Sequence, residues 1–230
     1  MKKIILAILM TFGIFTMVSA DIGVKLGVSA QIGSMSASGT EKNSDGVTPD
    51  QKSSEREALF ATGGFFIEKD LSQLGSFGSR LSIGYDNIVH DLDLGTVENP
   101  RVVSLGAGGN NVEAADHSLN AKITGFETFY ATVNITDWLY VKAGAVTVDI
   151  DTVFKGSATS NYPTAHSLDG TVTGFGLYRT TDTGWFSRLE YNDYDIDGKS
   201  VTNTGTDSKF SATLSDVSGS TGRISFGKAF

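Results

Sequence analysis

The chain has 230 residues, of which 26 are acidic and 18 basic, so its formal net charge is −8, and it contains no cysteine. An acidic chain has little electrostatic attraction for phosphate backbones, which argues against a nucleic-acid partner. The absence of cysteine excludes disulfide bonds and thiolate metal sites.

The N-terminal segment has the pattern of a secretory signal peptide. Met1-Lys2-Lys3 is a basic start, an apolar stretch runs from Ile4 to Val18, and Val18-Ser19-Ala20 offers small residues for cleavage. The apolar stretch is short for a spanning helix, which needs about 20 residues. We therefore expect a signal peptide over residues 1–20 and one mature domain over residues 21–230.

In the mature part, apolar residues alternate with polar or small ones, as in strands with one apolar face. Period two is clear in residues 22–33, 80–89, 139–145 and 185–192. Four further strands are expected near residues 58–69, 118–133, 170–181 and 209–230, with their facing left open. In the second of these, Glu127 breaks the alternation that Leu119 begins, and a bulge near Gly125 would explain the break. The last is too long for one spanning strand of about ten residues, so part of it must project or bend.

The expected connections alternate in length. Turns at residues 70–78, 134–137 and 181–184 are short, whereas residues 36–56, 92–117, 154–169 and 198–208 form long polar loops. This asymmetry is typical of outer-membrane β-barrels, in which both chain ends lie on the periplasmic side. Pro49, Pro100 and Pro163 all fall in the expected loops, as a closed barrel requires, because proline cannot donate to a ladder.

These patterns predict an all-β fold, an eight-stranded antiparallel transmembrane up-and-down β-barrel. Trp138 and Trp185 stand at the starts of two strands, where they would form a periplasmic-side aromatic belt. The alternative is a soluble β-sandwich with ordinary strand aromatics.

The chain ends Ile224-Ser225-Phe226-Gly227-Lys228-Ala229-Phe230. This ending resembles the terminal strand of outer-membrane barrels, and the mature chain is similar to the small barrel superfamily that includes outer membrane protein A and the opacity proteins. The resemblance implies a place in the outer membrane of a Gram-negative bacterium, among its lipids and lipopolysaccharide. It also implies that the barrel assembly machinery reads Phe226 and Phe230. Lys228 departs from the family pattern, which usually has an apolar residue there. We expect a monomer.

The same alternation points charged side chains into the barrel. The expected lumen residues are Lys25, Arg80, Asp86, Lys142, Arg188 and Glu190, with Glu68, Lys122 and Arg179 as further candidates. An eight-stranded barrel is just wide enough for its own side chains, so these charges should pair as a salt-bridged plug. The alternative is a narrow or gated solute path through the same network.

Three histidines, His90, His117 and His166, lie near the expected loops, and the last two are each followed by serine. Adjacent residues on a strand point to opposite faces, so neither pair offers a nucleophile with its base. We expect no catalytic residue and no cofactor. A structural or surface-interaction role leads, a small-solute channel is second, and a lipid A-modifying enzyme is a distant third.

Three ascending strands end in a repeated Asp-x-Asp pattern. Its members are Asp91 and Asp93, Asp149 and Asp151, then Asp193, Asp195 and Asp197. They keep the parity of the lipid-facing residues below them, so they should mark the upper edge of the apolar band. A sharper hypothesis is an acidic collar that holds divalent cations together with lipopolysaccharide phosphates. No other metal site is expected.

Overall fold

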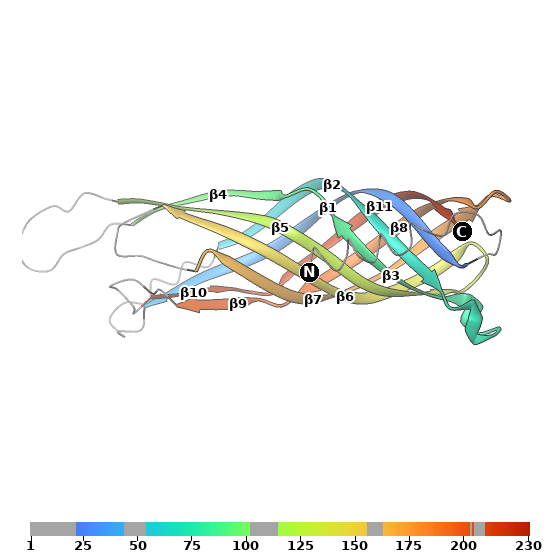
Figure 1. Ribbon diagram of the computed structural model, residues 1–230. Helices are drawn as coiled ribbons and strands as arrows, with labels where there is room; N and C mark the ends of the chain where they lie inside the picture. The colour runs from blue at the N-terminus through green and yellow to red at the C-terminus, as the bar shows by residue number, and fades with distance from the viewer. Residues whose placement is uncertain (1–21, 44–53, 102–114, 156–162, 203, 205–209) are drawn as a thin grey trace, which may run out of the picture.

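The computed structural model describes residues 22–43, 54–101, 115–155, 163–202, 204 and 210–230. They form an elongated closed β-barrel whose long axis is horizontal in Figure 1. We call the end with the short connections the turn end and the opposite one the far end. Among the described residues, no helix has the length and apolar character needed to cross a membrane. The expected signal peptide lies outside the described residues.

Eight antiparallel strands make the wall. Their bounds are β1 Val24–Asn43, β2 Ser54–Asp70, β3 Leu81–Ile88, β5 Ala115–Asn134, β6 Leu139–Lys155, β7 Ala165–Thr180, β8 Trp185–Ile196 and β11 Val217–Ala229. Three further strands continue it at the far end, namely β4 Leu92–Arg101, β9 Lys199–Thr202 and β10 Phe210–Leu214. Two 3-10 helices, η1 Ser72–Leu74 and η2 Gly78–Arg80, lie between β2 and β3. The predicted eight-stranded antiparallel barrel is confirmed.

The barrel closes through the ladder between β1 and β11, from Lys25 opposite Ala229 to Ser36 opposite Ser218. A row of directly paired residues that starts at Ser34 on β1 passes once around all eight strands and returns to β1 at Val24. The row is thus staggered by ten residues, because strands in a closed barrel tilt relative to its axis.

Glycines facing the interior make room for aromatic rings. Four of them lie directly opposite a ring on the next strand: Gly27 opposite Phe66, Gly84 opposite Tyr130, Gly176 opposite Tyr140, and Gly227 opposite Phe186. A Cβ on Gly84 would lie 2.4 Å from Cζ of Tyr130. In so narrow a barrel, an inward aromatic side chain therefore needs a glycine at the paired position of the next strand.

The facing that the sequence left open is resolved by burial. On β2 Leu59 is 82% exposed whereas Phe66 is buried, and on β7 Phe175 is exposed whereas Val172 is buried. The predicted bulge on β5 is confirmed, since the register with β6 shifts between Ile123 and Gly125. The predicted break in the last segment is also found, since β10 ends at Leu214 and β11 begins at Val217.

The polarity of the two barrel faces inverts along the strands. On β6 the outward side chains change from Leu139 and Val141 near the turn end to Thr147, Asp149 and Asp151 beyond. The inward side chains change the opposite way, from Tyr140 and Lys142 to the buried set Val146, Val148 and Ile150. No bulge interrupts β6, so the same strand has an apolar outer face near the turn end and an apolar inner face near the far end.

The inversion recurs on the neighbouring strands. On β8 the outward residues pass from Leu189 and Tyr191 to Asp193, while the inward residues pass from Glu190 to Tyr194. The inner apolar residues meet in one cluster at the far end, with Met35, Leu92, Ile123, Phe126, Val146, Val148, Ile150, Leu168, Val172, Tyr194 and Ile196. The far end thus has the apolar interior and polar exterior of a water-soluble β-protein, a reversal that the sequence alone did not predict.

The strands extend further than predicted, and this corrects the expected long loops. β1 runs to Asn43, and β4 occupies much of the loop expected at residues 92–117. β2 pairs with β3 only from Gly64 onward, and no ladder joins β2 to β4 among the described residues. The far end therefore parts into two four-stranded groups, β9-β10-β1-β2 and β4-β5-β6-β7. In Figure 1, β4 lies on the opposite side of the far end from β9 and β10.

Pro100 corrects a second expectation, because it lies in β4 rather than in a loop. It stands opposite Asp116 of β5, which is the only strand that pairs with β4 in the described part. The prediction assumed that a barrel has no free edge. The parting of the two sheets creates one, and proline is tolerated in an edge strand because N–H groups on the open side have no ladder partner. Pro49 lies outside the described residues.

Candidate functional site

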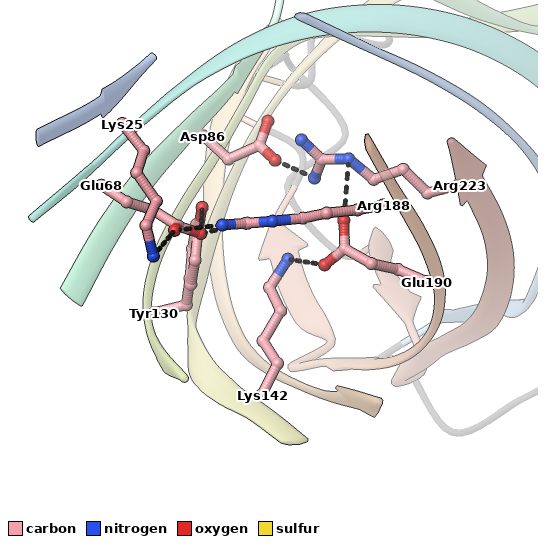
Figure 2. Close-up of polar contacts among 8 residues, drawn as sticks. All are labelled: Lys25, Glu68, Asp86, Tyr130, Lys142, Arg188, Glu190 and Arg223. Carbon is pink, nitrogen blue, oxygen red and sulfur yellow. Dashed lines mark hydrogen bonds and ion pairs between the residues drawn. The ribbon is translucent and has the colours of Figure 1, made fainter. Parts of the chain in front are cut away.

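The lumen near the turn end is occupied by a charged network, drawn in Figure 2. Arg188 on β8 donates through both Nη atoms to the two carboxylate oxygens of Glu68 on β2. The Tyr130 hydroxyl donates to Glu68 at 2.9 Å, and Lys25 Nζ lies 3.9 Å from its Oε2. Glu68 is only 1% exposed, so this carboxylate depends entirely on side chains from three other strands.

A second group lies beside the first and continues the network. Arg223 on β11 pairs with Asp86 through Nη1, and its Nε lies 3.4 Å from Oε2 of Glu190. The other carboxylate oxygen of Glu190 is 3.6 Å from Nζ of Lys142. All four side chains are buried, so each charge is balanced by a neighbour rather than by bulk water.

Aromatic rings surround the cations. The Arg188 guanidinium lies 5.0 Å from the ring centroid of Phe186 and 5.3 Å from that of Phe66. The Lys142 ammonium is 4.2 Å from the centroid of Tyr130. The faces of these rings are attractive to cations that have lost their hydration shell. The network is therefore held by ring contacts as well as by ion pairs.

Little open space remains in this part of the lumen. A void of about 10 Å³ lies near the turn end between Lys25, Tyr140 and Arg188, enough for one water molecule. Further up, the buried polar residues Gln31 and Asn192 follow the charges along their strands, and the apolar cluster comes next. The described interior is lined by three successive layers of side chains: charged, polar and apolar.

The structure brings together most of the residues that the sequence assigned to the lumen. Lys25, Asp86, Lys142, Arg188 and Glu190 all belong to it, as does the further candidate Glu68. Arg223 was missed, although it has the parity of Ser225 and Gly227, opposite to that of Ile224 and Phe226.

Three of the charges expected in the lumen lie elsewhere, which corrects the prediction. Arg80 lies in η2, exposed at the turn end, because β3 begins one residue later at Leu81. Lys122 faces outward and pairs with Asp91 at 3.4 Å, since the bulge at Gly125 shifts the parity of this part of β5. Arg179 is exposed at the turn-end rim, with the parity of Leu177.

The acidic residues lie on the outer face, as their parity predicts. Asp91, Asp149, Asp151, Asp193, Asp195 and Asp197 are all exposed, and the Asp93 side chain lies outside the described part. Glu127 and Asp169 are two outward acids that the Asp-x-Asp pattern did not include. The described residues contain no group of three or more His, Asp or Glu side chains placed to hold a metal ion. Cation binding together with lipopolysaccharide stays a prediction.

The turn-end rim carries exposed aromatic residues on the outer face. Trp138, Trp185, Phe226 and Phe230 are all about half exposed. Lys228 has the same outward parity, and its ammonium lies 5.7 Å from the ring of Trp185 and 5.5 Å from that of Phe230. The basic residue that departs from the family pattern is therefore placed at the rim, between two aromatic rings.

The described histidines form no catalytic arrangement with serine. Nε2 of His166 lies 2.9 Å from the carbonyl oxygen of Pro163, and His90 is exposed next to Asp91. The His117 side chain lies outside the described part.

Comparisons with solved structures find outer-membrane proteins at low identity. The outer membrane protease OmpT from Escherichia coli has 8% identity, a TM-score of 0.49, and coverage of 94% of this chain and 99% of its own. The outer membrane protein OprG from Pseudomonas aeruginosa has 8% identity and a TM-score of 0.49, and the match covers 91% of this chain and 98% of OprG. The attachment invasion locus protein Ail of Yersinia pestis has 12% identity, a TM-score of 0.28, and coverage of 86% and 98%.

No family model and no curated protein matches the chain. Membership of the outer membrane protein A and opacity superfamily therefore stays a prediction. The fold assignment above rests on the chain's own strand ladders.

Proposed function

We propose that the protein is an integral outer-membrane barrel with a structural or surface-interaction role and a non-conducting lumen. The observation that carries the proposal is the inversion of polarity along the strands. An apolar outer face next to a polar interior is suited to lipid, whereas the reverse arrangement is suited to water. The lower outer face thus favours hydrocarbon surroundings, and the far end favours exposure outside the membrane.

The height of the apolar outer band supports this assignment. Along β3 and the residue that follows it, the band runs from Leu81 to Val89, nine residues, and a tilted transmembrane strand needs about 9–11. Outward acids follow the band at its upper end, and the Trp138 and Trp185 rings stand at its lower end. Acidic side chains are tolerated at a membrane interface but not in its centre, and amphipathic rings favour the interface.

The filled lumen favours a structural role over a channel. A solute would have to displace the Glu68–Arg188 pair and then cross the apolar cluster around Val146 and Val148. Breaking a buried ion pair costs about 3–5 kcal/mol, and hydrated solutes have no polar partners among apolar side chains. We therefore place the function on the surface of the far end, with outer-membrane lipids and lipopolysaccharide around the band. We propose that the barrel assembly machinery recognises the last strand, β11, through Phe226 and the terminal Phe230.

The chain offers a direct test of this topology, because it has no cysteine and single introduced cysteines can be labelled specifically. Asp197→Cys at the far end should react with a membrane-impermeant maleimide on intact cells. Asp182→Cys, also exposed but in the β7–β8 turn at the turn end, should react only after the outer membrane is opened. Labelling of both on intact cells, or of neither, would contradict the proposed orientation.

Conductance separates the structural role from the solute channel. Purified protein in planar bilayers should give no discrete current steps, while a known porin measured beside it should. Reproducible single-channel steps would make the narrow channel the better assignment.

A further inference from the structure

The turn between β2 and β3 is the longest of the three connections at the turn end, spanning residues 71–80. Backbone hydrogen bonds hold it in shape, from Leu74 N to Leu71 O at 2.8 Å and from Ser79 N to Gly75 O at 3.1 Å. The Asp70 carboxylate accepts bonds from the amide and the hydroxyl of Ser72. It is an ordered element with its own two 3-10 helices.

This element displays two large apolar side chains. Leu74 is 72% exposed and Phe77 is 74% exposed, more than Ile83 on the outer band, at 51%. Neither side chain is needed to cover the barrel interior, because both lie beyond the ends of β2 and β3. Two such side chains held together on a short, pinned turn form an apolar surface that is unfavourable in water.

The turn lies beside the aromatic rim rather than below the barrel mouth. In Figure 1 it projects sideways from the wall at the turn end. Nη1 of Arg80 lies 3.5 Å from the carbonyl oxygen of Ile135. This contact joins the β2–β3 turn to the β5–β6 turn, the next one around the rim. That turn exposes Ile135 and Trp138, each 49%. The two turns therefore form one apolar edge that continues the outer band.

We propose that the β2–β3 turn is a membrane anchor that inserts Leu74 and Phe77 into the periplasmic leaflet. This rests on the proposed function, because it requires the outer band to lie in a bilayer. Arg80 and Lys69 stand on the same side of the barrel, where their cationic groups suit lipid phosphates. Continuity with the rim favours lipid over a periplasmic protein, since the edge already lies where the leaflet would be.

Tryptophan fluorescence measures directly how deeply positions 74 and 77 lie in the bilayer. The reporter is Phe77→Trp in a Trp138→Phe, Trp185→Phe background, refolded into vesicles of phosphatidylcholine and phosphatidylglycerol with or without bromine on the acyl chains. We expect blue-shifted emission that brominated lipids quench at least twofold. The matched control is Gln73→Trp, an exposed polar position in η1, which should emit as in water with little quenching. Leu74→Trp is a second reporter in case Phe77→Trp does not refold.

The unaltered protein separates the two possible failures. If brominated lipids quench its Trp138 and Trp185 but leave Trp at positions 74 and 77 unquenched, the anchor is wrong and the barrel assignment stands. If they quench neither native tryptophan, the membrane assignment itself is wrong. Reporters that escape brominated lipid and are also shielded from acrylamide would show a protein contact, which overturns insertion into lipid.

Discussion

Glu68 on β2 and Arg188 on β8 form an ion pair across the barrel lumen, although 120 positions separate them in the sequence and their strands are not neighbours. The guanidinium donates two parallel bonds to one carboxylate, the strongest geometry for this pair. The pair connects two sides of the wall that share no ladder, so it acts as a cross-brace.

The first prediction follows from this cross-brace. Glu68→Gln keeps the size of the side chain but leaves the buried Arg188 charge without its main partner. We expect the free energy of unfolding to fall by about 3–5 kcal/mol, as for other buried pairs that lose one member. Urea titration in lipid vesicles, followed by the gel mobility of heated and unheated samples, measures it. The control is the double variant with Arg188→Met, which should recover part of the loss. Equal stability of Glu68→Gln and the unaltered protein would contradict the brace.

A second prediction compares two phenylalanines of β5. Phe126 points into the far-end cluster and packs edge-to-face on Tyr194, with ring centroids 5.4 Å apart. Phe126→Ala should lower the free energy of unfolding by about 3–5 kcal/mol because it leaves a cavity. Phe129, three positions on, is 64% exposed on the outer face, so Phe129→Ala should cost clearly less in the same urea titration. The inverted polarity of β5 would be wrong if the order of the two losses were reversed.

A third prediction uses two glycines. In Gly84→Ala the new methyl group would lie 2.4 Å from the Tyr130 ring, which is itself held by its bond to Glu68. We expect a loss of about 1–3 kcal/mol from overpacking. Gly222→Ala is the matched control, because nothing lies within 4 Å of its Cβ position, and its effect should stay within about 0.5 kcal/mol. Thermal unfolding of the two refolded variants checks both, and equal losses would show that the ring yields without cost.

The fourth prediction concerns assembly. Deleting Phe230 removes the terminal aromatic residue and should lower the amount of folded, heat-modifiable barrel in the outer membrane several-fold, with the remainder in periplasmic aggregates. Lys228→Val is the control: it keeps Phe230 and restores the apolar alternation, so its level should equal or exceed that of the unaltered protein. Quantitative blotting of membrane fractions gives the result. Normal levels after the deletion would show that the ending is not read during assembly.

Alternation and the lengths of the connections predicted the barrel, and alternation assigned most of the charged residues that the structure places in the lumen. Once Leu26 and Val28 are assigned to the outer face, Lys25 must face inward, and the same parity rule places Arg188 and Glu190. The rule holds as long as a residue lies within a strand and no bulge intervenes. The prediction for Arg80 was wrong because this residue lies one position before the start of β3. The prediction for Lys122 was wrong because the bulge at Gly125 reverses the facing of residues on its N-terminal side.

The far end could not be predicted by the same reasoning. We assumed one outer environment along each strand, so Val146, Val148 and Ile150 had no assigned place once the apolar face had been set by Leu139 and Val141. Their alternation with Thr147, Asp149 and Asp151 was a readable signal, but it indicates a strand in water rather than in lipid. The pairing of Glu68 with Arg188 was likewise out of reach, because it depends on the stagger of non-adjacent strands.

If the outer band lies in a bilayer, as proposed, the inversion of polarity also sets the bilayer thickness that the protein can match. A spanning helix adapts to a bilayer of different thickness by changing its tilt, but the tilt of the strands relative to the axis of a closed barrel is fixed by the stagger. In a thicker bilayer the acids that follow the band, among them Asp193, would be drawn into hydrocarbon, so the lipid must thin around the wall instead. Compression of the surrounding lipid favours contact between barrels, because neighbours share the deformed zone. In the proposed membrane placement, the height of the band would therefore favour membrane regions whose hydrocarbon thickness matches it.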